Sequence, residues 1–306
     1  MKTLYILGNG FDIAHGLKTR YSDFYNYLSE NKDTQSFLYN MIEAYGAYDE
    51  EWWNTFEESL GDGSWFEMEF ENMAESVIDN MVTDDGDEMP DIESTLETHW
   101  EAYYKFMEKL NNYVLKWISD SVDLSMVKPK VRKLKRTDDF FVNFNYTMVL
   151  EEIYKISEWN VFHVHGSVSE RSTIMGHGNL EAIRRYKDRT DMAMARFDKN
   201  TATVNKAIAS FYEATLKDTQ WIINTSNYFW KKLKTVEKVE IYGHSLGTVD
   251  MPYLKKIQVS ISPNAEWNIY NFDMTEREIR ERFNLLDVQQ EFIHVLPYED
   301  FLGSKK

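Results

Sequence analysis

Short apolar runs alternate with amphipathic stretches at both ends of the chain. The first run, Thr3 to Leu7, stops at Gly8, as expected of a buried strand in a parallel sheet. Further apolar runs predict strands at 140–144, 161–165, 173–175, 239–242, 267–270 and 292–295. Helical spacing of apolar residues predicts helices at 23–30, 203–217, 220–234, 251–259 and 275–285. The alternation predicts an α/β fold, a Rossmann-like parallel sheet with helices on both faces.

The stretch between the first two predicted strands has a different pattern. Apolar residues recur at helical spacing over 36–120 without strand signals, and glycine and aspartate clusters mark turns at 61–63 and 84–87. We interpret 36–136 as a large helical insertion into a core formed by 1–35 and 137–306. Its last part, Lys128 to Arg136, is basic, and we interpret it as a solvated linker.

The insertion also carries the acidic excess of the chain. The formal net charge is −17, and 21 of the 51 acidic residues lie in 33–104, which contains no lysine or arginine. A solvated acidic surface is the simplest interpretation, and a docking face for a basic partner is the alternative. Direct nucleic-acid binding is not expected, because the segment would repel phosphates.

Length and composition restrict the class of protein further. A chain of 306 residues with no cysteine forms neither disulfides nor a thiolate zinc site, and it fits a reducing compartment. No apolar run reaches about 18 residues, and the N-terminal run is too short for a signal peptide. We therefore expect a cytoplasmic protein that does not contact a membrane.

The first candidate site is the turn between the first strand and the next helix. It consists of Gly8, Asn9, Gly10, Phe11 and Asp12. Glycines at such a turn let backbone N–H groups approach a phosphate, and the helix N-terminus adds favourable charge. The third glycine of the dinucleotide-binding motif G-x-G-x-x-G is replaced by Ile13, so the motif alone is weak.

Two further candidates follow later strands. Asn145 lies where the strand at 140–144 ends, which is where ligands bind in open parallel sheets, although a turn asparagine is the simpler interpretation. His163 and His165 share one face of the next strand. No nearby acidic residue or cysteine completes a metal set, so we expect no metal. His165 precedes a glycine and suits a general base, whereas His163 is expected to be structural.

The fourth candidate is Gly243-His244-Ser245-Leu246-Gly247, which matches the nucleophile elbow G-x-S-x-G of α/β-hydrolases. Ser245 followed by Asp273 or Asp287 and then by His294 would give the required order of triad residues. Pro252 falls where the helix behind an elbow should continue, and His294 lies within an apolar strand pattern. Both positions weaken the hydrolase interpretation.

Taken in order, these segments resemble the sirtuin-like NAD-binding fold. The stretch from Gly8 to Lys18 repeats the spacing of the sirtuin segments G-A-G-I-S and G-I-P, with Asp12 and Lys18 in place of the serine and proline. Asn145 falls at the functional asparagine of T-Q-N-I-D, and His165 at the catalytic histidine of the sirtuin H-G. Gly243, His244 and Ser245 match the G-T-S that contacts the cofactor.

The chain more closely resembles the bacterial abortive-infection AbiH family. The resemblance rests on L-G-N-G-F-D-I-A-H-G-L-K-T-R-Y-S-D-F at 7–24, F-N-Y-T at 144–147, V-H-G at 164–166 and Y-G-H-S-L at 242–246. It implies defence against phage, and related sirtuin-like defence proteins hydrolyse NAD. The zinc-binding cysteines of sirtuins are missing, so deacetylation is not implied.

The resemblance leads to a main hypothesis and two alternatives. The main hypothesis is an NAD(+) glycohydrolase in which Asn145 and His165 are catalytic and the two glycine-containing loops bind the nucleotide. We expect alanine at either catalytic position to abolish turnover without affecting folding. The alternatives are a serine esterase that uses Ser245 and a nucleotide-sensing module without turnover. A phage protein as trigger and a second copy of the chain are candidate partners.

Overall fold

The computed structural model describes residues 2–30, 56–63, 106–134, 138–272 and 274–303, with further single positions between 67 and 101. These residues form two compact units. Unit 1 comprises Met1–Tyr27, Asn112–Ile174 and Asp218–Lys306, and unit 2 comprises Leu28–Asn111 and Met175–Lys217. This division differs from the expected one, because 112–134 belongs with the core and 175–217 joins the helical part.

Unit 1 contains a six-stranded sheet in which every pair of neighbours is parallel. Its strands are β1 (Lys2–Leu7), β2 (Phe140–Asn143), β3 (Val161–His163), β6 (Val236–Tyr242), β7 (Glu266–Asn271) and β8 (Ile293–Pro297). The order is β3-β2-β1-β6-β7-β8. Counting only these six strands, this is the order 3-2-1-4-5-6 of the doubly wound dinucleotide-binding fold. The prediction of a Rossmann-like α/β fold is confirmed.

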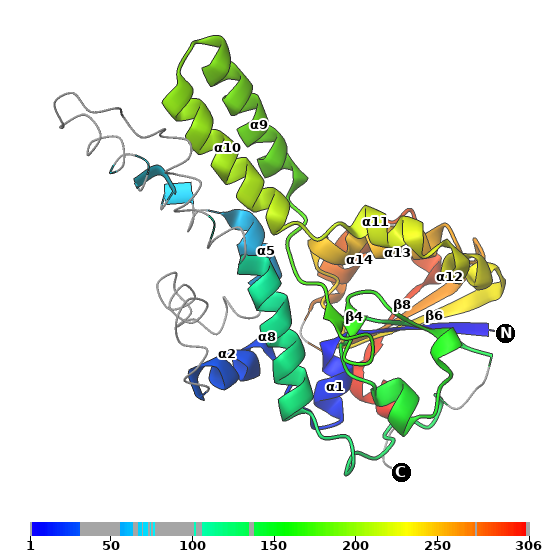
Figure 1. The fold of residues 1–306 in the computed structure, drawn as a ribbon. Helices are drawn as coiled ribbons and strands as arrows, with labels where there is room; N and C mark the ends of the chain where they lie inside the picture. Colours follow the sequence, from blue (N-terminus) through cyan, green and yellow to red (C-terminus); the bar gives the residue numbers. More distant parts are fainter. Residues whose placement is uncertain are drawn as a thin grey trace. The chain divides into compact units, whose positions relative to one another are not determined.

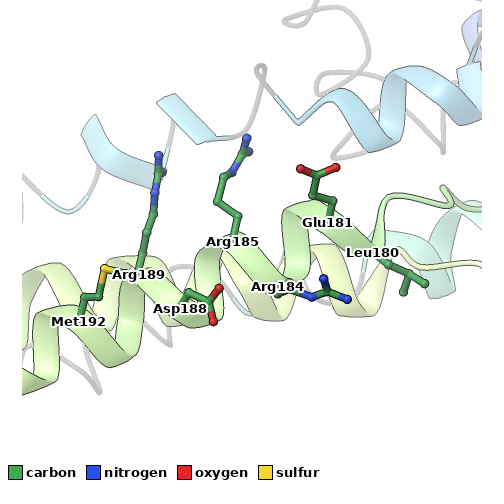
Figure 2. A pocket seen from close by; sticks show the side chains of 7 residues that line it. All are labelled: Leu180, Glu181, Arg184, Arg185, Asp188, Arg189 and Met192. Carbon is green, nitrogen blue, oxygen red and sulfur yellow. The ribbon is translucent and has the colours of Figure 1, made fainter.

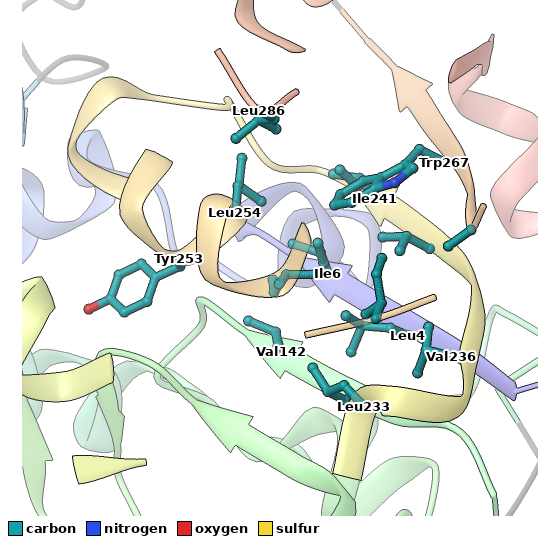
Figure 3. Packing of buried hydrophobic residues seen from close by; sticks show 14 of the residues in the cluster. Leu4, Ile6, Val142, Leu233, Val236, Ile241, Tyr253, Leu254, Trp267 and Leu286 are labelled. Atoms are coloured by element: carbon teal, nitrogen blue, oxygen red, sulfur yellow. The ribbon is translucent and has the colours of Figure 1, made fainter. Parts of the chain in front are cut away.

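Helices cover both faces of this sheet (Figure 1). One face carries α11 (Thr219–Thr225), α12 (Asn227–Lys232), α13 (Met251–Gln258) and α14 (Glu276–Asn284), and the other carries α1 (Asn9–Ala14), the π-helical turn η2 (Val149–Ile153) and α15 (Tyr298–Leu302). Leu4 and Ile6 belong to the core under the first face, together with Trp267 (Figure 3). Tyr5 and Leu7 belong to the core on the other side. A strand buried on both sides is therefore apolar at successive positions, which is why it is visible in the sequence.

Two predicted elements differ in detail from those observed. The expected helix 220–234 is split into α11 and α12 at Ser226, within a polar stretch that favours caps and turns over helix. The expected strand 173–175 does not join the main sheet. Instead, β5 (Ser172–Thr173) pairs antiparallel with β4 (Gly166–Ser167).

The described part of unit 2 is helical. It includes α5 (Phe56–Asp62), α9 (Leu180–Ala195) and α10 (Lys199–Ala214), and α9 packs along α10. The helices α2 (Tyr21–Glu30) and α8 (Phe106–Ser121) cross the boundary between the units. A buried ion pair lies within unit 2, where Lys217 Nζ is 2.8 Å from Glu57 Oε2. Most of the remaining predicted helical insertion, and the turn at 84–87, lie outside the described residues.

The basic segment at 128–134 is not a solvated linker. Val131 and Leu134 are buried in the core of unit 1. Lys133 pairs with the buried carboxylate of Glu240 on β6, and its Nζ lies 4.2 Å from the ring centroid of Phe301. Long basic side chains can bury their stems and keep a paired head group, so a run of lysines and arginines does not by itself indicate a free linker.

The turn after β1 lies directly against the turn after β6. Gly8 N donates to Tyr242 O at 3.0 Å, and Gly10 N donates to Gly243 O at 2.9 Å. A Cβ added at Gly243 would lie 2.5 Å from Gly10 Cα, and a Cβ at Gly8 would lie 2.4 Å from Gly243 O. Gly243 also has a φ of 64°, a conformation that glycine adopts readily. The three glycines therefore allow the turns after β1 and β6, which are neighbours in the sheet, to touch through their backbones.

Gly243→Ala is expected to lower the free energy of unfolding by about 3 kcal/mol or more, because backbone strain and a backbone clash add together. Gly16→Ala is the matched control. Gly16 has a φ of 84° but has nothing within 4 Å of an added Cβ, so only the strain cost of about 1–2 kcal/mol should remain. Urea denaturation of both variants tests the difference, and equal losses would contradict the role assigned to the contact.

Candidate functional site

The carboxyl ends of the central strands align at one edge of the sheet. Leu7 of β1 pairs with Asn143 of β2 on one side and with Tyr242 of β6 on the other, and Asn143 pairs with His163 of β3. The segments that follow these residues contain Asn145, His165 and the two glycine-containing loops. In a doubly wound sheet, this edge at the reversal of strand order is where ligands bind. The structure thus brings the four sequence segments to one place.

The turn predicted to hold a phosphate makes internal contacts. Gly8 N–H donates to Tyr242 at the end of β6, Gly10 N–H donates to Gly243 in the loop after it, and Phe11 N donates to Gly8 O at 2.9 Å. The Asn9 side chain is held by Thr19, through bonds of 2.8 Å and 2.6 Å. These contacts account for the glycines by packing and do not offer their N–H groups to a phosphate. Direct contact of this turn with a nucleotide remains a prediction.

Phe11 and Asp12 point into unit 1. Phe11 is buried in the core, with its ring centroid 4.5 Å from that of His15. Asp12 is also buried, and Thr147 Oγ1 donates to its Oδ2 at 2.7 Å, while no described residue bonds to its Oδ1. Burial raises the pKa of the Asp12 carboxyl from 3.8 to about 7, although the bond from Thr147 opposes the shift.

Asn145 holds the loop after β2 against the end of β1. Its Nδ2 donates to Gly8 O at 3.1 Å and to Asn143 Oδ1 at 2.9 Å, and its own N–H donates to the same Oδ1. The side chain is buried. Asn145 is therefore at the predicted edge of the sheet, and its amide nitrogen has a positioning role there.

His163 supports the same loop from β3. Its Nδ1 lies 3.0 Å from Asn145 O, and its Nε2 lies 3.0 Å from Glu151 Oε1. Both partners are acceptors, so the ring satisfies both only when both nitrogens carry a proton. Burial opposes that charge, but the hydrogen bond and the charge of Glu151 outweigh burial and raise the pKa of His163. This arrangement agrees with the structural role expected for His163.

His165 and His244 lie on either side of one carboxylate. His165 Nε2 is 3.3 Å from Asp250 Oδ1, and His244 Nε2 is 3.5 Å from Asp250 Oδ2. The Phe144 ring meets both imidazoles edge-on, with centroid distances of 5.2 Å to His165 and 4.2 Å to His244. Both histidine side chains are buried. A histidine held against a carboxylate can accept a proton from a reacting group, so the cluster is suited to general base catalysis.

The loop with Ser245 lacks the features of a nucleophile elbow. In an elbow the serine sits on a strained turn, but here the positive φ values fall on Gly243 and Leu246. Arg282 of α14 binds the carbonyl oxygens of Ser245 and Leu246, each at 2.7 Å. Among the described residues, no histidine or carboxylate is bonded to the Ser245 hydroxyl. His294 is exposed on β8, and Asp273 lies outside the described residues.

Unit 2 has a surface hollow of its own, of about 730 Å³, along α9. Its lining residues are Leu180, Glu181, Arg184, Arg185, Asp188, Arg189 and Met192 (Figure 2). Arg185 Nη2 lies 3.1 Å from Glu67 Oε1. None of the predicted site residues lines this hollow, and it brings together no nucleophile and base.

No group of three or more histidine, aspartate or glutamate side chains in the described part of the chain is arranged to hold a metal ion. Within the same residues, no helix combines the length and apolarity needed to cross a membrane.

Sequence reasoning missed the acidic partners of this site. Asp250 and Glu151 hold histidines and lie in no recognised motif, whereas Thr147, which holds Asp12, lies in one. Thr147 is the last residue of F-N-Y-T and could have been inferred from it. For Asp250, the available signal is its position three residues after Gly247, directly beyond the fourth candidate site.

Fold and site together define a Rossmann-like α/β protein with a histidine and asparagine cluster beside its strand-order reversal. The chain belongs to the bacteriophage abortive infection AbiH family, whose sequence profile matches residues 4–271. No curated protein and no solved structure gives a significant match to it. Family membership indicates a role in abortive infection of phage-infected cells.

Asp12→Asn should become more stable than the wild type as pH rises. The folded protein keeps a proton on Asp12 up to about pH 7, whereas the unfolded chain releases it near pH 4, so raising the pH between these values destabilises the wild type. Asparagine removes this effect, and the difference should approach about 4 kcal/mol above pH 7. Urea denaturation across this range measures the difference, with the exposed substitution Asp138→Asn as control. Parallel profiles for Asp12→Asn and the wild type would show that Asp12 is ionised.

Asn145→Ala should lower the free energy of unfolding by about 1–3 kcal/mol, because it removes buried hydrogen bonds. This revises the expectation that folding is unaffected. Asn264→Ala, in an exposed turn, is the control and should unfold like the wild type. Thermal denaturation distinguishes them, and an unchanged melting temperature for Asn145→Ala would contradict the positioning role.

Proposed function

We propose that this protein acts in anti-phage defence by hydrolysing NAD(+) to nicotinamide and ADP-ribose at the carboxyl edge of the unit 1 sheet. The observation that carries the proposal is the placement of His165. It follows β3, is held against Asp250, and lies on the same edge as Asn145 and the reversal of strand order. The resemblance of these segments to sirtuin-like NAD-binding motifs supports the choice of substrate.

The reaction needs little from the protein beyond positioning and a base. The C1′–N bond of the nicotinamide ribose breaks, and its electron pair leaves with nicotinamide as a neutral base. A water oxygen forms the new bond to the cationic C1′, and His165 takes the proton released from that water. The products are nicotinamide, ADP-ribose and one proton. Holding water, base and sugar in line supplies most of the acceleration.

The remaining residues have supporting roles in this proposal. Asn145 fixes the loop after β2, and its side-chain carbonyl oxygen would orient the ribose or the attacking water. His244 and Ser245 would line the nucleotide site from the loop after β6, which Arg282 anchors. The packed turn from Gly8 to Asp12 would shape the site between these loops.

The biological setting is part of the same proposal. Depletion of NAD inside an infected cell would stop phage replication, which requires the protein to act in the cytoplasm. A phage protein would supply the trigger, and either unit 2 or a second copy of the chain would supply the surface that responds to it.

Nicotinamide release from NAD by the purified protein tests the proposal. His165→Asn should lower kcat by about 10²-fold or more, the usual contribution of a general base. Ser245→Ala is the comparison variant and should stay within about tenfold of the wild type, because Ser245 only lines the site. The same variants should be compared for NAD content in phage-infected cells, where the natural trigger is present.

Each other outcome has a definite meaning. NAD that binds but stays intact in both settings would indicate a sensing module. Loss of activity only in Ser245→Ala, with labelling of Ser245 by a fluorophosphonate, would favour the esterase. If the protein does not bind NAD and does not release nicotinamide, NAD is rejected as the substrate.

A further inference from the structure

One exposed aromatic side chain lies at the carboxyl edge of the unit 1 sheet. Phe272 comes directly after β7, and its relative exposure is 77%. Among the large hydrophobic side chains that are exposed in the described part of the chain, no other directly follows a strand of this sheet. Single exposed hydrophobic residues are common on protein surfaces. The position of Phe272 is what makes it informative, because ligands bind beyond the carboxyl ends of the strands in this fold.

The loop after β7 is held on both sides of Phe272. Met274 N donates to Asn271 Oδ1 at 3.1 Å, and Asn271 Nδ2 donates to Met274 O. An asparagine side chain that bonds the backbone a few residues further on is typical of a turn. Met274 also packs against the core on the face of α13 and α14. The turn and the core contact together present Phe272 at the surface in a defined place.

Tyr298 connects Phe272 to the turn after β1. The ring centroids of Phe272 and Tyr298 lie 5.1 Å apart at an interplanar angle of 64°, which is an edge-on arrangement. Tyr298 stacks on Tyr242 with a centroid distance of 4.4 Å, and its hydroxyl donates to Gly10 O at 3.0 Å. Tyr298 is thus fixed by the end of β6 and by the turn after β1. Phe272 extends this aromatic contact to the end of β7.

The order of the strands determines the direction in which a bound dinucleotide extends. β3, which His165 follows, is the end strand of the sheet, and β2, which Asn145 follows, is the next one. A nucleotide with its reacting ribose at these two residues therefore continues along the carboxyl edge past β1 and β6 toward β7. Neighbouring strands lie about 4.8 Å apart, so β7 is about 14 Å from β2. The two riboses and the diphosphate of an extended NAD span this distance.

The far end of NAD is a base, and the ring of Phe272 suits a base. Every nucleobase has a π-face, so stacking on an aromatic side chain requires no particular pattern of hydrogen bonds. Such stacking requires a ring that ligands can reach and that is held in place. Phe272 meets the first condition by its exposure and the second by its contact with Tyr298 and by the turn at Asn271.

We infer that Phe272 stacks on the adenine ring of the dinucleotide, so that the adenosine half of NAD lies beyond β6 and β7 and the nicotinamide ribose lies beyond β2 and β3. This inference rests on the proposed function for the identity of the substrate. Phe272 contributes to the binding of the adenosine half and takes no part in the cleavage of the bond to nicotinamide.

A comparison of two substrates tests this role. Nicotinamide mononucleotide contains the same bond between ribose and nicotinamide as NAD but lacks the adenosine half. Phe272→Ala should raise KM for NAD about tenfold or more with little change in kcat, because stacking is lost equally from the bound substrate and the transition state. Cleavage of the mononucleotide should not change. Phe272→Trp keeps a stacking ring and should stay within about threefold of the wild type. Leu285→Ala, which removes another exposed hydrophobic side chain, is the matched control.

Calorimetric titration with ADP-ribose separates this inference from the proposed function, because ADP-ribose contains the adenine and the diphosphate and its binding requires no turnover. Phe272→Ala should bind it about tenfold or more weakly than the wild type and Leu285→Ala do. Equal affinities of Phe272→Ala and the wild type, no binding by the wild type, or an equal loss of activity on NAD and the mononucleotide would overturn the inference. If ADP-ribose binding depends on Phe272 but no nicotinamide is released, the proposed function fails while the inference holds.

Discussion

The architecture of unit 1 depends on the contact of two backbones at the reversal of strand order. Gly8 and Gly10 lie against Gly243 with no space for a side chain between them. Because this contact closes the gap between β1 and β6, the loops that follow these strands have fixed positions. A larger residue at any of the three places would separate the loops. The glycines that resemble a phosphate-binding motif are thus explained first by packing, and any nucleotide must be recognised by the residues around them.

The polar groups near this contact form two groups of interacting side chains. In the first group, Asp12 accepts a hydrogen bond from Thr147, and His163 contacts both Asn145 O and Glu151, so both side chains hold the loop of Asn145. The pKa values of both buried groups are raised, for different reasons. Burial favours the neutral acid of Asp12, whereas Glu151 favours the cation of His163 against the opposing effect of burial. In the second group, Asp250 lies between His165 and His244. The first group of contacts fixes a loop backbone, whereas the second places two imidazole side chains beside one carboxylate.

The sequence predicts the sheet better than the site. Strands buried on both faces appear as apolar runs, so β1 and β2 could be located directly. Helix α9 could not, because its buried face consists of only Ala182, Ile183, Tyr186 and Ala193 among charged residues. The motifs located His165 and Asn145, but not the donor bonds that make Asn145 a positioning residue. Asp250 reaches His165 across 85 positions of sequence, and only the folded sheet brings them together.

We propose that the carboxyl edge of the unit 1 sheet binds NAD, and the proposed function depends on this binding. Hydrogen–deuterium exchange with and without millimolar NAD measures this most directly, because it reports on each loop and does not require turnover. The account predicts slower exchange in the loops at 143–147, 163–166 and 243–250, with α9 and α10 unchanged. No change in these loops, or protection confined to α9 and α10, would contradict it.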